Sequence, residues 1–173
     1  MTDYYSPDGG LPPQTTLHTG RAIFKEAYAF IPKGVMTDIV TSRFPNWDKT
    51  RAWILARPLS GFAETFSQYI MEVSPNGGSL NPEPEVNAEG FLFIVSGQLD
   101  LDLGGATYKM IEGGYAYISP NSDWKVVNSS TKNVTFHWIR KYYEKIDGFD
   151  VPESFVTNEK DIDPGGLTSQ QTN

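Results

Sequence analysis

The chain has 173 residues, a formal net charge of −7 at pH 7 and a sequence pI near 4.8. Its 39% hydrophobic and 20% charged residues are typical of a globular chain with one core and not of a disordered one. The acidic balance argues against nucleic acid as a partner, because binding to phosphate depends on Lys and Arg. The absence of cysteine excludes disulfides, thiolate metal sites and cysteine nucleophiles.

Neither end of the chain has a periodic apolar pattern. Residues 1–19 are rich in Pro, Gly and Thr and predict a flexible N-terminal arm, and residues 151–173, ending in DIDPGGLTSQQTN, predict a linker or tail. No apolar run approaches ~20 residues and no charged-then-apolar leader is present, so we expect no membrane association and a cytoplasmic location. The folded domain is predicted to occupy residues 20–150.

Within that domain, aromatic and β-branched runs of strand length are separated by Gly, Pro, Asn and Ser. No long amphipathic helix is indicated, and one or two helical turns are predicted only around residues 153–162. The pattern therefore predicts an all-β domain, an antiparallel β-barrel of the jelly-roll kind with flexible N- and C-terminal arms. The predicted strands are RAIF, YAFI, VMTDIV, RAWILA, FAETFSQYIMEV, GFLFIVS, QLDLDL, TYKMI, YAYIS, WKVVN and VTFHWIRKYY.

The clearest strand is residues 99–103, in which three leucines alternate with two aspartates. A period of two places the leucines on one face and the aspartates on the other, so one face is predicted to meet the core and the other water. Gly104 and Gly105 follow directly and supply the positive φ values that a two-residue hairpin turn needs.

The spacing of glycines and polar residues resembles the two motifs of the cupin barrels, G-x5-H-x-H-x(3,4)-E-x6-G and G-x5-P-x-G-x2-H-x3-N. In the second motif Gly114 and Pro120 match, Lys125 stands at the histidine position, and the asparagine is displaced by one residue to Asn128. A protonated lysine donates hydrogen bonds and cannot coordinate a metal. The second motif thus predicts the cupin fold without its metal ligand.

The first motif can be placed in two registers, and neither contains a histidine. Counting from Gly97 puts Glu83 and Glu85 at the two histidine positions and Gly90 at the metal-binding glutamate; counting from the carboxylates gives Glu83, Glu85 and Glu89. Three carboxylates suit a hard cation such as Mg²⁺ or Ca²⁺. Without a cation, two carboxylates ~4 Å apart repel by about 4 kcal/mol at an effective dielectric near 20.

We therefore favour a stiff exposed loop, Pro-Glu-Pro-Glu at residues 82–85, with solvated glutamates. Glu83, Glu85, Glu89 and Lys125 are interpreted as degenerate cupin positions, and we predict no catalytic residue, no metal ligand and no cofactor in this chain.

Other candidate residues have simple structural interpretations. His18 falls in the N-terminal arm, and His137, inside a strand, is interpreted as a hydrogen-bonded wall residue. Trp47, Trp53 and Trp124 suit a core, a pocket or a subunit contact. As an alternative, an anionic small molecule would bind in the barrel mouth at Lys125, Tyr69, Tyr117 and His137.

The linear order of segments resembles one cupin family in particular, the (S)-ureidoglycine aminohydrolases of allantoin breakdown, which contain two cupin barrels. The segments that carry this resemblance are RAI at 21–23, YAFIPKG at 28–34, PNGG at 75–78, EGFLFIVSG at 89–97, EGGYAY at 112–117 and RKYY at 140–143. In that family the Mn²⁺ ligands, a glutamate, two histidines and a glutamine, belong to the second barrel, as do the side chains that contact substrate. The first barrel has lost its metal ligands.

The resemblance implies that this chain corresponds to the N-terminal barrel, followed by a tail where a second barrel would begin. We expect it to be inactive alone and to serve as a structural or oligomerisation partner, either as a homo-oligomer or with a second cupin barrel. The family releases ammonia hydrolytically from the ureide (S)-ureidoglycine and yields ureidoglycolate. Two alternatives stay open: a metal-free binding or structural cupin, and an enzyme that uses the carboxylates to hold a metal.

Overall fold

The computed structural model describes residues 23–24, 28–31, 43–56, 65–163 and 165. The predicted arm of residues 1–19, the predicted strand VMTDIV and the end of the predicted tail lie outside the described residues. The elements are β1 (Ile23–Phe24), β2 (Ala29–Phe30), β3 (Asp48–Ala56), β4 (Phe66–Ser79), β5 (Ala88–Ser96), β6 (Gln98–Leu103), β7 (Ala106–Ile111), β8 (Gly114–Ile118), β9 (Trp124–Val127), β10 (Val134–Tyr142), β11 (Phe155–Asn158) and the 3-10 turn η1 (Glu159–Asp161).

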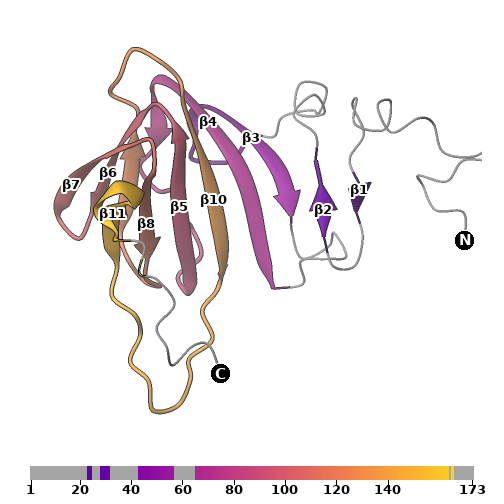
Figure 1. Cartoon of the computed structure of the whole chain (residues 1–173), viewed down its shortest axis with the longest axis vertical. Coiled ribbons are helices and arrows are strands. Elements are labelled where there is room, and N and C mark those ends of the chain that lie inside the picture. The colour runs from indigo at the N-terminus through magenta and orange to yellow at the C-terminus, as the bar shows by residue number, and fades with distance from the viewer. Residues whose placement is uncertain (1–22, 25–27, 32–42, 57–64, 164, 166–173) are drawn as a thin grey trace, which may run out of the picture.

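The strands β3 to β11 form one antiparallel sheet that curls into a barrel (Figure 1). The strand order is β11-β8-β5-β10-β4-β9-β6-β7, and β3 pairs with β4 beside β10. The edge strand β7 lies against β8 and β11, so the barrel is nearly closed. β1 and β2 pair with each other in a separate two-stranded sheet. The predicted all-β antiparallel barrel is confirmed.

Alternation along the strands defines the inside of the barrel. In β6 the three leucines are buried and Asp100 and Asp102 are not, as the sequence pattern predicts. Gly104 and Gly105 form the turn into β7 with φ values of 60° and 83°. The even-numbered residues are buried from 88 to 94 in β5, from 114 to 118 in β8 and from 134 to 138 in β10, which produces a continuous core that includes Leu92, Ala116 and Phe136.

The C-terminal part of the described chain differs from the prediction. The predicted helical turns around residues 153–162 are wrong for residues 155–158, which form β11 and pair with β8 from Phe155↔Tyr117 to Asn158↔Gly114. Only η1 is helical, and the Asn158 side chain accepts a hydrogen bond from Lys160 N at its start. The edge of β8 offers unpaired backbone N–H and C=O groups. Residues 155–158 are extended because this conformation lets them hydrogen-bond to that edge. The sheet thus extends beyond residue 150, the predicted end of the barrel.

No helix in the described part of the chain has the length and apolar character needed to cross a membrane.

Candidate functional site

The interior of the barrel is filled by aromatic rings around Trp138 of β10. The Trp138 ring centroid lies 5.5 Å from that of Tyr69, 5.6 Å from Trp47 and 6.0 Å from Trp124. Trp138 is 2% exposed. Trp47 and Trp124 are therefore core residues, whereas Trp53 is partly exposed on β3 beneath the Arg51 guanidinium.

Gly90 of β5, at the position of the metal-binding glutamate in one register, lies directly beside this cluster. A Cβ added to Gly90 would be 3.5 Å from Trp138 Nε1 and 3.8 Å from Ile118 Cβ. Trp138 Nε1 is buried and has no hydrogen-bond partner among the described residues. A side chain at position 90 would therefore begin in van der Waals contact with the indole.

Glu83 is not solvated, so this part of the exposed-loop interpretation is wrong. Its side chain is 8% exposed and forms an ion pair with Arg140, in which Nη2 donates to Oε1 at 2.6 Å and Nε lies 2.6 Å from Oε2. The Arg140 guanidinium in turn lies over the Trp138 ring, 5.6 Å from its centroid. Trp47 Nε1 donates a hydrogen bond to Pro82 O at 3.4 Å, which also holds the loop against the barrel.

Burial raises the pKa of Glu83, and the backbone N–H of Glu85 and the charge of Arg140 oppose this rise only in part. The folded protein consequently binds the proton more tightly than the unfolded chain does. We expect wild type to gain stability relative to Glu83→Gln as the pH falls from about 7 to about 4. In that range folding of wild type takes up a proton at Glu83, whereas the glutamine of the variant cannot. Denaturant titrations at several pH values measure this shift, and a constant difference or a shift toward the variant would contradict it.

Glu85 and Glu89 have partners of their own. Tyr142 OH donates to Glu85 Oε2 at 2.7 Å, and Tyr117 OH donates to Glu89 Oε2 at 2.7 Å. Burial and the Glu89 carboxylate raise the pKa of Tyr117, which keeps the phenol protonated as the donor. Glu85 is exposed as predicted, and Glu89 lies on the outer face of β5, between the inward residues Ala88 and Gly90.

The three carboxylates do not converge. Within the part of the chain that the structure describes, no three His, Asp or Glu side chains are grouped so as to hold a metal ion. A cation at Glu83 would have to displace Arg140, and Glu89 faces the other side of the strand. The described residues therefore do not fit Mn²⁺ or a hard cation at the cupin motif.

The four residues of the alternative anion site are also dispersed. Tyr69 faces the interior, whereas Tyr117 and His137 lie on outward positions of their strands. Lys125 is exposed on β9 between two buried residues. His137 Nδ1 lies 3.5 Å from Gln68 Nε2, and burial lowers the pKa of the imidazole. His137 thus lies in the wall of the barrel. His18 lies outside the described residues.

Asn128, the displaced motif asparagine, has a structural function that the sequence did not indicate. It is fully buried, and its Nδ2 donates to Val73 O and to Lys132 O, both at 2.8 Å. Its Oδ1 accepts from Ser130 N at 3.0 Å and from Ser130 Oγ at 2.7 Å. One side chain therefore ties the turn before β10 to β4.

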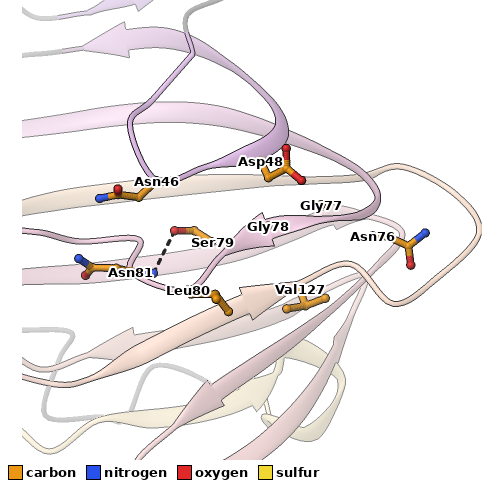
Figure 2. Close-up of a pocket in the computed structure, with 9 residues that line it drawn as sticks. All are labelled: Asn46, Asp48, Asn76, Gly77, Gly78, Ser79, Leu80, Asn81 and Val127. Atoms are coloured by element: carbon orange, nitrogen blue, oxygen red, sulfur yellow. Dashed lines mark hydrogen bonds between the residues drawn. The ribbon is translucent and has the colours of Figure 1, made fainter.

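A surface cavity of about 480 Å³ lies at the end of β4 (Figure 2). Asn46, Asn76 and Gly78 have positive φ values of 66°, 56° and 141°. A Cβ on Gly78 would lie 2.0 Å from Val126 O, so this close approach of β4 and β9 requires glycine. Its lining combines amide, hydroxyl and carboxylate groups with the apolar side chains of Leu80 and Val127. The lining residues are Asn46, Asp48, Asn76, Gly77, Gly78, Ser79, Leu80, Asn81 and Val127.

Comparison with known proteins agrees with the barrel geometry. Residues 60–143 match the family model of the EutQ-like cupin domain. The antiparallel barrel and this match define the protein as one with a cupin domain.

Among curated proteins, the chain is 28% identical over 135 residues to (S)-ureidoglycine aminohydrolase of Escherichia coli K12, covering 77% of this chain and 49% of that protein. The chain thus spans about half the length of this relative. Among solved structures it is similar to a glyoxylate-induced protein from Pseudomonas aeruginosa (TM-score 0.79, 55% identity, 99% of this chain and 62% of that one). It is also similar to the E. coli protein Ylba (TM-score 0.74, 25% identity, 88% and 61%). The chain is a cupin protein related to (S)-ureidoglycine aminohydrolase, which confirms the predicted family.

Proposed function

We propose that this chain is the metal-free cupin barrel of a ureidoglycine aminohydrolase-like protein and has a structural role beside a second, catalytic barrel. The observation that carries this proposal is the replacement of the motif's metal site by a packed interior. The buried Trp138 indole lies beside Gly90, and Arg140 forms an ion pair with Glu83.

The electrostatics of the motif positions support the same conclusion. A site for Mn²⁺ needs neutral or anionic ligands that point to one place. Lys125 lies outside the barrel, Glu89 is held by Tyr117 on the outer face, and Glu85 is exposed. No step of the reaction is therefore assigned to residues of this chain.

The match to this chain covers 49% of the E. coli aminohydrolase. This proportion suggests that the catalytic residues lie in the other half of such a protein. In this proposal the second barrel would hold manganese and bind (S)-ureidoglycine, and manganese would supply Lewis-acid chemistry for hydrolytic loss of ammonia. The barrel described above would provide a rigid packing surface for it.

The test uses the purified chain with and without the part of the P. aeruginosa relative that the chain does not cover. We expect the chain alone to contain far less than one manganese per polypeptide by elemental analysis and to release no ammonia from ureidoglycine. The two polypeptides together are expected to release ammonia, since the second supplies the metal site. Tightly bound manganese together with turnover by the chain alone would contradict the proposal.

A further inference from the structure

A second surface cavity, of about 510 Å³, lies where the start of β3 meets β4 and the residue before β10. Its volume is within the range of small-molecule pockets. Three cations and two carboxylates line it, although the whole chain has 14 Lys and Arg residues against 21 Asp and Glu. The lining is therefore positive in a protein that is acidic overall. The charged residues are Arg43, Lys49, Arg51, Asp48 and Glu72.

Both carboxylates of this cavity already have partners. Arg51 Nε donates to Glu72 Oε1 at 3.0 Å, and the two side chains form an ion pair. Asp48 Oδ1 accepts a hydrogen bond from the backbone N–H of Lys49 at 3.0 Å. None of the ion pairs between described residues includes Arg43 or the Lys49 side chain. Two cations of the cavity are thus available to an anion from solution.

Two neutral polar side chains in the lining are available as well. The Ser74 hydroxyl and the Asn133 amide line the cavity, and neither forms a side-chain hydrogen bond within the part of the chain that the structure describes. Both can donate to a carboxylate oxygen and accept from a hydroxyl group. The Thr50 hydroxyl, by contrast, donates to Asp48 O at 2.7 Å. The cavity therefore combines two cations with two further donors that the fold itself does not use.

Lys49 is held in an uncommon backbone conformation, with a φ of 46°. Glycine and asparagine adopt positive φ far more readily than lysine does, and residues held in such conformations cluster at ligand sites. The pairing of β3 with β4 shifts register between Asp48 and Thr50, an irregularity of the kind that changes the direction of a side chain. A Cβ on Gly77 would lie 2.9 Å from Lys49 Cβ, so the neighbouring glycine makes room for this lysine.

We propose that this cavity binds a small polar organic acid, with its carboxylate groups held by Arg43 and Lys49 and its hydroxyl groups by Ser74 and Asn133. A guanidinium matches the two oxygens of a carboxylate, and the lysine adds a second positive charge. Two available cations suit a ligand with two negative charges. None of the cupin-motif positions lines this cavity. The inference therefore goes beyond the structural role proposed above and does not depend on it.

The first experiment is isothermal titration calorimetry of the full chain with L-malate, a dicarboxylate with one hydroxyl group. We expect a Kd on the order of 1 mM or tighter at low salt, which weakens as added salt screens the charges. Malamide, the neutral diamide of malate, should bind at least about tenfold more weakly, because it cannot pair with the two cations. No binding of malate up to about 10 mM would overturn the proposal. Tighter binding of inorganic phosphate than of malate would overturn the assignment to organic acids.

The second experiment locates the site with variants. Lys49→Asn and Arg43→Gln should each raise the Kd for malate at least about tenfold, since each removes a charged hydrogen-bond donor. Asparagine tolerates the positive φ at position 49, and Arg43 lies outside the strands, so circular dichroism should show both variants folded.

Lys109→Gln is the matched control. Lys109 is exposed on β7, does not line this cavity, and its replacement changes the net charge by the same amount. We expect it to leave the Kd for malate unchanged. An equal rise in Kd for Lys109→Gln and the two cavity variants would overturn the proposal, because overall charge would then explain the binding. These experiments measure neither ammonia release nor metal content, so their failure is distinct from failure of the proposed function.

Discussion

Replacement of Trp138 by alanine is expected to lower the free energy of unfolding by about 3–5 kcal/mol, the range for removal of a large buried aromatic side chain. Trp138 is 2% exposed and contacts the rings of Tyr69, Trp47 and Trp124. Its removal leaves a cavity in the middle of the barrel, where strands on several sides cannot move inward together. Because a domain is stable by only about 5–15 kcal/mol, the loss would be a large part of the total.

Denaturant unfolding followed by far-UV circular dichroism measures this loss. Trp138→Phe is the graded control. It keeps one aromatic ring in the cluster and removes the second ring of the indole together with the buried Nε1, which lacks a hydrogen-bond partner among the described residues. We expect it to cost clearly less than the alanine variant. Equal losses for the two variants would show that the ring contacts are not what stabilises the interior.

Replacement of Asn128 by alanine is expected to cost about 2–4 kcal/mol, since each buried polar group left without a partner costs about 1–3 kcal/mol. The variant leaves Val73 O without the Asn128 donor and Ser130 N without its acceptor, whereas Lys132 O keeps the Ser130 hydroxyl as a donor at 2.9 Å. The end of β4 and the turn before β10 would lose their connection. The same unfolding measurement checks the effect.

Asn87→Ala is the matched control for Asn128, because Asn87 is exposed and its described hydrogen bond is made by the backbone carbonyl. We expect a change within about 0.5 kcal/mol, as for surface substitutions elsewhere. Asn128→Asp keeps the shape but removes both donors and adds a buried charge, so it should be at least as destabilising as alanine. A loss below about 1 kcal/mol for both Asn128 variants would contradict this clamp function.

The packed interior also explains how a cupin barrel remains stable without its motif ligands. Carboxylates aimed at one place repel unless a cation joins them. In this protein Arg140 takes the place of the cation at Glu83, and the Trp138 ring lies beneath the guanidinium. The Arg140 guanidinium therefore interacts both with the Glu83 carboxylate and with the face of the Trp138 ring, since cations and aromatic faces attract each other.

Features encoded by one segment were predictable from the sequence alone. The leucine and aspartate alternation of residues 99–103 predicted both the strand and its buried face, and Gly104 and Gly105 predicted the hairpin. These features depend on a local period of two and on local φ values, so one window of the chain contains all the information. The missing histidines likewise showed from residue identity alone that the cupin motif lacks its usual ligands.

Features that join distant segments were decided by the tertiary structure. Glu83 was expected in water because its loop is polar, yet its side chain is largely buried and forms an ion pair with Arg140, 57 residues away. Residues 155–158 became a strand because the edge of β8 was available, and Asn128 became a clamp because Val73 lies beside its turn. A local pattern reports which face of a strand is apolar, but the partner that meets a polar side chain depends on how the barrel closes.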